Sequence, residues 1–128
     1  MKGYILNIEE ETLKNNDFRR VLYTTQHSQL VLMCIPGGMD IGEEIHHLDQ
    51  FIRLEAGSAT VILDDVTHTV EKDFAIVIPA GTKHNVMNTG TVDLKIYTIY
   101  TPPEHKDGII EHTKADVIEE HFDGRTSE

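Results

Sequence analysis

The sequence predicts an all-β fold, arranged as a sandwich or a closed barrel in one domain. Eight short segments rich in Val, Ile, Leu, Thr and Tyr follow one another at strand spacing. Turn-forming Gly, Pro, Asp and Asn residues separate these segments. The chain has 128 residues and no linker long enough to separate a second domain. Strands at this spacing are typical of β-sandwiches and barrels.

The elements are expected in the following order. A short helical turn over 9–15 comes first, and an Asn-Asn-Asp run at its end stops it. The strands are expected at 18–24, 29–35, 50–54, 59–63, 67–71, 75–78, 84–88 and 94–101. Turn signals fall at 36–38, 56–57, 64–65, 79–81 and 88–90. Because alternation is imperfect in the fourth strand, periodicity alone does not set which of its side chains face the core.

The C-terminal part is expected to form an extension outside the barrel, after a Pro-Pro pair at 102–103. Thr113 is a candidate N-cap, with Asp116 three residues later, for a helix that continues through 117–118. The short N-terminal helix is likewise expected to lie outside the barrel. We therefore expect a single domain over 1–128, with the barrel core at about 18–101 and the extension at 102–128.

The composition narrows the expected partners and location. The chain carries 22 acidic and 11 basic residues, for a formal net charge of −11 at pH 7. This charge repels phosphate backbones and no Lys or Arg cluster offsets it, so no nucleic acid is expected to bind. No apolar run approaches the roughly 20 residues that a membrane helix needs. The N-terminus reaches Glu9 before an apolar signal-peptide region can form, so a cytoplasmic location is expected.

Two polar segments together predict a metal site. Glu44 and His46 are two residues apart, so in a strand both side chains leave the same face of the sheet. Gln50 follows four residues after His46, and His84 comes just after a Pro-x-Gly turn that can fold its segment over the first. One ion would then have two nitrogen and two oxygen ligands. Glu43, the rival carboxylate, points to the opposite face by the same alternation.

These segments resemble the two motifs of the cupin superfamily. The first motif runs Gly, five residues, His-x-His, three or four residues, Glu, six residues and Gly; the matching positions are Gly38, Glu44, His46, Gln50 and Gly57. The second runs Gly, five residues, Pro-x-Gly, two residues, His, three residues and Asn; the matching positions are Asp73, Pro79, Gly81, His84 and Asn88. With the strands around them, the two motifs cover about 28–101.

The chain departs from the family pattern at three positions. Glu44 replaces the first histidine, Gln50 replaces the glutamate, and Asp73 replaces the glycine that opens the second motif. Aspartate is among the few residues that tolerate a left-handed turn, so that turn is expected to survive. The small bacterial single-domain cupins labelled mannose-6-phosphate isomerase-like are similar, since they share the Glu-x-His-x-x-x-Gln variant and a tail like residues 97–105.

The resemblance implies a double-stranded β-helix, a jelly-roll-like barrel, that binds a metal and pairs as a homodimer. It makes Glu44, His46, Gln50 and His84 the expected ligands. Two imidazoles, a carboxylate and an amide oxygen suit a divalent ion of Zn, Mn, Fe, Co or Ni. Such an ion keeps open positions for water or substrate, where it polarises a carbonyl or lowers the pKa of bound water.

Three functions remain open for such a site. The first is an enzyme that uses the metal as a Lewis acid on a small polar substrate such as a sugar or an oxo-acid, isomerase-like by resemblance. The second is a metal-dependent dioxygenase, which needs a redox-active ion. The third is a non-catalytic module that binds a small ligand, usually fused to a DNA-binding domain when it serves transcription. The sequence contains no such domain, which favours the enzyme.

Arg53 and Tyr97 are the candidate catalytic residues, because both lie in strands expected to border the cavity. Arg53 suits a carboxylate or phosphate on a substrate, and an ordinary surface ion pair is the alternative. The tail histidines are seven and nine residues apart, which matches no familiar metal pattern, so surface positions are expected for His105, His112 and His121.

Overall fold

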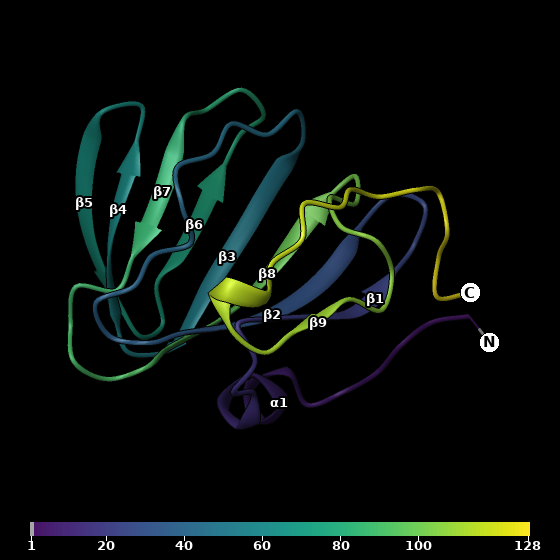
Figure 1. Ribbon diagram of the computed structural model, residues 1–128, viewed down its shortest axis with the longest axis horizontal. Coiled ribbons are helices and arrows are strands. Elements are labelled where there is room, and N and C mark those ends of the chain that lie inside the picture. Colours follow the sequence, from purple (N-terminus) through teal and green to yellow (C-terminus); the bar gives the residue numbers. More distant parts are fainter. Residues whose placement is uncertain (1) are drawn as a thin grey trace.

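The computed structural model describes residues 2–128, and these form a mostly β structure with one short α-helix (Figure 1). The helix is α1 (Ile8–Lys14). The strands are β1 (Arg19–Thr24), β2 (Gln29–Ile35), β3 (Asp49–Ala56), β4 (Ser58–Leu63), β5 (Val66–Glu71), β6 (Ala75–Ile78), β7 (His84–Met87), β8 (Leu94–Thr101) and β9 (Ile110–Glu111). A 3-10 helix covers Lys114–Asp116. No helix in 2–128 is both long and apolar enough to cross a membrane.

The strands form two antiparallel sheets that face each other. The larger sheet has six strands in the order β6-β3-β8-β2-β1-β9, and the smaller has three in the order β5-β4-β7. The segment before β3 extends the smaller sheet, because isolated bridges join Asp40 to Met87 and Glu44 to His84. The first motif therefore lies alongside β7, which carries the last part of the second motif.

The core lies between the two sheets and follows the expected alternation. In β3, Gln50, Ile52 and Leu54 are buried, whereas Phe51 and Arg53 between them are only partly buried. The buried apolar side chains of both sheets form one cluster that includes Val31, Met33, Ile52, Leu54, Val61, Val86, Leu94 and Ile96. Burial of this apolar surface is the main stabilising contribution to the fold. Polar Gln50 is therefore exceptional among its inward-facing neighbours.

The strand predictions are confirmed closely. Three strands have the expected bounds, and the other five differ by one or two residues at an end. The helix α1 begins and ends one residue earlier than expected, because Asn7 caps it and accepts a hydrogen bond from the Glu10 N–H at 3.0 Å. The strand β9 was not predicted, since two residues carry no period.

Two turns show why the motif positions hold particular residues. Gly57 has a φ of +86°, and a Cβ there would lie 2.8 Å from the Asp93 carbonyl oxygen. Only glycine fits such a position. Asp73 has a φ of 75°, and its N–H donates to the Leu54 carbonyl at 2.9 Å. The expected left-handed turn is therefore kept despite the loss of the motif glycine.

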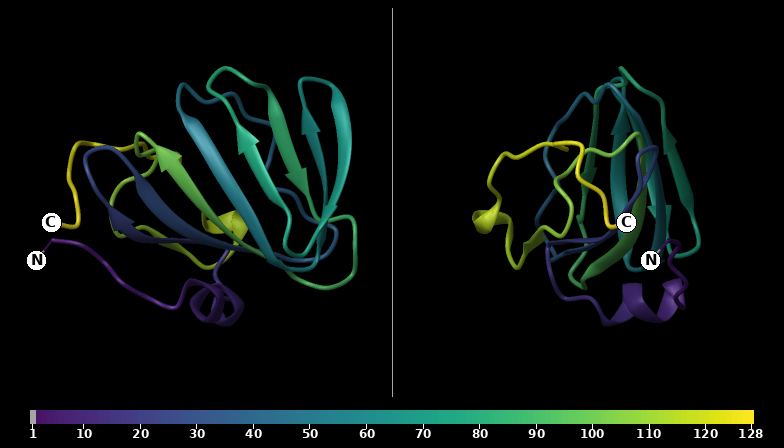
Figure 2. Two further views of the ribbon diagram at one scale, coloured as in Figure 1. Left: turned by 180° about the vertical axis from the view of Figure 1, so that it is seen from behind. Right: turned by 90° about the vertical axis from the view of Figure 1, so that its right-hand side faces the viewer.

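The C-terminal extension, which was expected to lie outside the barrel, adds one strand to the edge of the larger sheet. Its β9 pairs with β1 in the larger sheet, and two views in Figure 2 show the chain beyond β8 lying against the body of the molecule. The Asp116 carboxylate accepts from the Thr113 N–H at 3.1 Å, as a capping box requires. The predicted helix through 117–118 is wrong: Val117 is extended, and the Ile118 N–H instead donates to the Glu111 carboxylate at 3.2 Å.

Candidate functional site

The structure brings three of the four expected ligands into one cluster. Glu44 and His84 exchange two backbone hydrogen bonds of 2.9 Å, so their side chains start from adjacent points. The carboxylate of Glu44 lies 3.1 Å from Nε2 of His46, and the ring centroids of His46 and His84 are 5.2 Å apart. Residues 45–48 belong to no strand, but Ile45 is exposed and His46 buried, so the expected alternation holds.

Gln50 approaches the cluster from the inner face of β3. It is buried, and its Nε2 donates to the Thr98 hydroxyl at 3.1 Å. Its Oε1 is buried and has no hydrogen-bond partner. Tyr100 of β8 lies opposite Gln50 of β3. Its ring meets the His46 ring edge-on, with centroids 5.9 Å apart. The amide oxygen is therefore available to a ligand on the side of the barrel where His46 lies.

The hydrogen bonds of His84 leave one ring nitrogen free. Nδ1 of His84 lies 2.8 Å from the Thr82 carbonyl oxygen. Because a carbonyl oxygen only accepts, a proton sits on Nδ1, and in the neutral ring Nε2 is then the nitrogen with the lone pair. Histidines that bind a metal usually donate their other ring N–H to a carbonyl or carboxylate oxygen, which fixes the tautomer in this way.

Burial shifts the pKa values of two side chains in the cluster. It raises the pKa of Glu44, although the positive charge of Arg19 opposes the shift. Burial also lowers the pKa of His46, with Glu104 opposing. Both shifts favour the neutral form of the group, as expected when charged atoms leave water.

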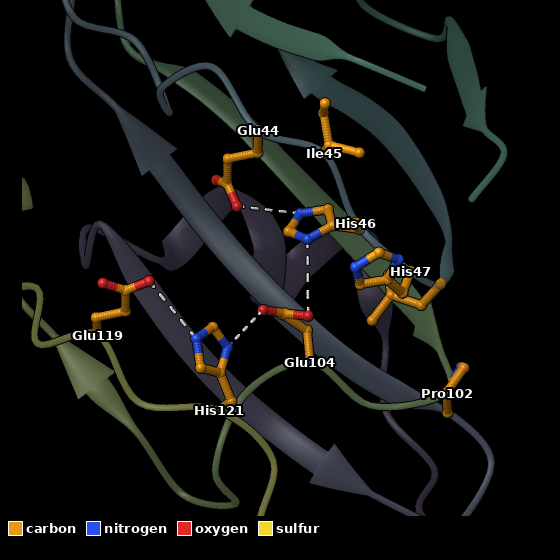
Figure 3. A pocket seen from close by; sticks show the side chains of 9 residues that line it. Glu44, Ile45, His46, His47, Pro102, Glu104, Glu119 and His121 are labelled. Atoms are coloured by element: carbon orange, nitrogen blue, oxygen red, sulfur yellow. Dashed lines mark hydrogen bonds and ion pairs between the residues drawn. The ribbon is translucent and has the colours of Figure 1, made fainter. Parts of the chain in front are cut away.

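A cavity of about 570 Å³ opens beside the cluster (Figure 3). It is lined by Glu44, Ile45, His46, His47, Leu48, Pro102, Glu104, Glu119 and His121. Figure 3 shows Glu104 between two imidazoles, and the measured separations are 3.6 Å to Nδ1 of His46 and 2.9 Å to Nδ1 of His121. The hydrogen bond that His121 makes to the Glu104 carboxylate raises the pKa of His121. Sequence reasoning missed Glu104 and His121, which reach the site from the C-terminal extension.

The expectation that Arg53 and Tyr97 line the cavity is wrong. In β3 the buried face carries Gln50, so Arg53, three residues on, leaves the opposite face. Its guanidinium pairs with Glu55 at 2.7 Å and with Asp73 at 3.0 Å, which is the ordinary ion-pair alternative. Tyr97 lies opposite Arg53 in the neighbouring strand, on the same outer face. Neither residue borders the cluster of proposed ligands.

The surface position expected for His105 is also wrong. Its ring packs edge-on against Tyr100 with centroids 5.1 Å apart. Its backbone is held by the Gln29 side chain, which donates to the His105 carbonyl at 2.7 Å and accepts from its N–H at 3.0 Å. Burial lowers the pKa of His105 to about 3. His112 and His121 are exposed as expected, with 77% and 65% of their side chains accessible.

Acid is expected to destabilise the protein through His105. The folded pKa is about 3, against about 6.5 for an unfolded histidine, so between these values only the unfolded chain binds the proton. Stability is therefore present above pH 6.5 and falls by up to about 1.4 kcal/mol per pH unit below it. Urea unfolding of the wild type and His105→Gln checks this result. Between pH 7 and pH 5 the wild type should lose about 2 kcal/mol more than the variant, and equal losses would contradict it.

As they stand, no three His, Cys, Asp or Glu side chains within 2–128 are arranged to hold a metal ion. Glu44 and His46 contact each other directly in this arrangement. The fourth expected ligand, Gln50, is of a different type and has a free buried oxygen.

Comparisons with known proteins agree on the fold. The sequence model described as the cupin domain matches residues 31–100. The uncharacterized protein YrkC of Bacillus subtilis is 45% identical over an alignment of 124 residues, and the alignment covers 91% of this chain and 67% of that protein. The crystal structure of BH2720 from Bacillus halodurans is 48% identical and covers 90% of this chain and 92% of that one, with a TM-score of 0.88.

A more distant structure supports the fold alone. An RmlC-like cupin from Methanocaldococcus jannaschii, described as a double-stranded β-helix, has a TM-score of 0.64 and 17% identity. The aligned parts are 80% of this chain and 91% of that one. The barrel is thus shared across proteins whose sequences have largely diverged.

Proposed function

Because this chain belongs to the cupin domain family, we propose that its barrel holds a divalent metal ion between Glu44, His46, Gln50 and His84. The observation that carries the proposal is the buried Gln50 Oε1, which has no hydrogen-bond partner. A buried polar atom without a partner costs free energy and calls for an explanation, such as an ion. The same oxygen is the ligand atom that this position would supply.

The other groups of the cluster fit the same ion. The Gln50 amide nitrogen is fixed on Thr98, so its oxygen is the free end. Nδ1 of His84 is fixed on the Thr82 carbonyl, so Nε2 is the free nitrogen. Two imidazole nitrogens, one carboxylate and one amide oxygen suit Zn, Mn, Fe, Co or Ni. Thus each anchored ligand offers the atom that a metal requires.

The proposed activity is that of an enzyme on a small polar substrate, a sugar or an oxo-acid, with an isomerase-like reaction. A bound divalent ion would supply Lewis-acid polarisation of a substrate carbonyl. The cavity of about 570 Å³ receives the substrate beside Glu44 and His46. His121 lines the same cavity, and its hydrogen bond to Glu104 raises its pKa, which favours the protonated form that a proton donor needs.

Elemental analysis of protein purified without added metal or chelator tests the proposal. The expected result is near-stoichiometric Zn, Mn, Fe, Co or Ni in protein prepared in air or without oxygen. Iron retained only in the anaerobic preparation would favour the dioxygenase alternative. Protein that contains no metal and binds none of these ions on titration would overturn the metal site, leaving the ligand-binding module.

Replacing Glu104 by glutamine is expected to weaken metal binding by about 10-fold, since loss of an outer carboxylate typically costs 10- to 100-fold in affinity. The carboxylate faces Nδ1 of His46, where it orients the ring and raises the basicity of the ligating nitrogen. A competition titration with a coloured chelator measures the change. Glu43→Gln removes the same charge from an exposed neighbour of the site. Equal losses of metal affinity in both variants would mean that Glu104 contributes only through its negative charge.

We also propose a homodimer in the cytoplasm, on the resemblance to small single-domain cupins of the mannose-6-phosphate isomerase-like group. Light scattering is expected to give twice the 14.5 kDa of one chain. A mass of one chain at micromolar concentration would contradict the dimer.

A further inference from the structure

The outer face of the larger sheet carries a row of apolar side chains. The strand register places one residue from each of five strands side by side, in the order Val77, Phe51, Ile99, Leu30 and Tyr23. Each of them stands next to buried core residues in its strand, so its side chain points away from the smaller sheet. The face of an antiparallel sheet that meets water is usually polar, so an apolar row here indicates a covered face.

The neighbouring row on the same face contains no acidic residue either. Across the same five strands it holds Ala75, Arg53, Tyr97, Leu32 and Arg20. The ten positions of the two rows thus include no Asp or Glu, although the chain has 22 of them and a net charge of −11. Two copies of so acidic a chain repel each other, and the repulsion is weakest where the facing surfaces carry no carboxylate. This face is therefore the one best suited to contact a second copy.

The helix α1 covers only one end of this face. It packs against β3 and β8, where the Lys95 ammonium donates to the Leu13 carbonyl at 2.7 Å. Leu32 lies at that end and is 1% exposed, whereas Val77 in the apolar row is 65% exposed. The other four members of the apolar row also stay partly exposed. The row therefore lacks a full cover within the described residues 2–128.

The segment before α1 adds an exposed apolar side chain to the same face. The Tyr4 ring stacks on Tyr23 with centroids 5.2 Å apart, and the Gly3 N–H donates to the Tyr23 hydroxyl at 2.9 Å. These contacts hold the segment at the β1 end of the apolar row. Ile5, the next residue, is 99% exposed, so its own chain covers almost none of it. Transfer of such a side chain from water into an apolar contact is favourable.

Two-fold symmetry can bring the exposed isoleucine and the exposed valine of two copies together. Ile5 lies at the β1 end of the row and Val77 at the β6 end, and β8 is the middle strand of the five. When two such sheets stack face to face about an axis that runs along β8, the β1 side of each copy lies over the β6 side of the other. The same contact then forms twice, as in any isologous interface.

We propose that the outer face of the larger sheet is the interface of a homodimer, in which Ile5 of each copy packs against the Val77 end of the partner's apolar row. The dimer itself was proposed above on resemblance alone, and the present inference rests on it. The interface adds which face is used and which residues meet. It lies on the opposite side of the sheet from Gln50, so the proposed metal site stays open.

The size of the face agrees with a small stable dimer. Five strands about 4.8 Å apart, each about seven residues long at about 3.3 Å per residue, present about 550 Å² on one side. A standard interface takes about 800 Å² from each partner. The segment before α1 and the exposed side of α1 lie beside the sheet and supply further surface. The face is therefore large enough for the pairing of two copies.

A single aspartate on this face tests the interface by sedimentation velocity over a dilution series. Val77→Asp is expected to raise the dissociation constant of the dimer at least about 100-fold, because symmetry places the new charge in the apolar interface twice. Val92→Asp is the matched control, since Val92 is 64% exposed and lies in the loop between β7 and β8, outside both rows. Both valines are exposed in the single chain, so both variants should fold. Equal dissociation constants for the two variants would overturn the interface.

A disulfide between copies tests the contact of Ile5 with the partner. Ile5→Cys with Val77→Cys is expected to give covalent dimers on oxidation, seen on a non-reducing gel, whereas either single variant stays a single chain. Within one chain the two ends of the row are four strand spacings, or about 19 Å, apart, and a disulfide spans less than about 7 Å between Cα atoms. The natural thiol, Cys34, is buried. A double variant that gives no more covalent dimer than the single variants overturns the arrangement.

The wild-type mass separates this inference from the proposals on which it builds. Wild-type protein with the mass of one chain overturns both the dimer and the interface. A wild-type dimer that Val77→Asp leaves intact overturns the interface alone. Metal content is measured in the same samples and is expected to be the same in wild type and Val77→Asp, because Val77 points away from the proposed ligands. Metal-free wild-type protein that still dimerises through this face fails only the metal proposal.

Discussion

Replacing Glu44 and His84 together by alanine is expected to reduce bound metal from near-stoichiometric to undetectable, with the barrel still folded. The two residues would provide one of the two imidazoles and the only carboxylate of the proposed set. The ion would keep His46 and an uncharged amide, which is too little to hold it against water. The fold should survive, because Glu44 lies outside the strands and both backbone hydrogen bonds between the two residues remain.

A second double variant controls for the loss of one glutamate and one histidine. Glu43→Ala with His68→Ala removes the same residue types from exposed positions that do not contact the cluster. Elemental analysis and far-UV circular dichroism are measured on both proteins. Full metal content in the Glu44 and His84 variant would reject the ligand assignment. Loss of metal from both variants would point to a change in folding or net charge.

The sequence was informative wherever a residue and its partner are linked by fixed spacing. The alternation that exposes Glu43 and buries His46 follows from an extended backbone, and it held although residues 45–48 form no regular strand. The turn at Asp73 was predictable because few residue types accept a positive φ. The approach of His84 to Glu44 followed from the motif resemblance and could not have come from periodicity.

The wrong prediction for Arg53 and Tyr97 could have been avoided from the sequence. If Gln50 faces the cavity, a residue three positions later in the same strand must face away. The period of two therefore excluded Arg53 as soon as Gln50 was assigned inward. Tyr97 fails by the same rule, since its neighbours Ile96 and Thr98 are among the four buried residues of β8.

The contribution of the C-terminal extension was beyond local patterns. Arg19 pairs with Glu111, 92 residues away, and no spacing rule connects them. Glu104 and His105 belong to the tail that resembles other small cupins, but their proximity to His46 and Tyr100 depends on how the chain turns after β8. Non-local contacts of this kind are set by tertiary packing, which outweighs the signals that a short window contains.

Removing one partner of the buried Arg19–Glu111 pair is expected to cause a large loss of stability. Glu111→Ala leaves the Arg19 guanidinium buried without its carboxylate partner. It also removes the hydrogen bond that the Ile118 N–H donates to the same carboxylate. An uncompensated buried charge costs about 3 kcal/mol or more. The free energy of unfolding, measured in urea, should fall by that amount. Glu10→Ala breaks an ion pair of the same 2.7 Å length on the surface of α1 and should change little.

The double variant Arg19→Met with Glu111→Met distinguishes the cause of that loss. If the penalty comes from the unpaired charge, removing both charges should recover most of the stability, since a buried pair and well-packed apolar side chains are often equivalent. If the double variant is as unstable as Glu111→Ala, the loss comes from packing or from the broken link to Ile118. If the link to Ile118 is the cause, Glu111 stabilises the fold by holding the C-terminal extension, and truncating the chain before Ile118 should destabilise the protein equally.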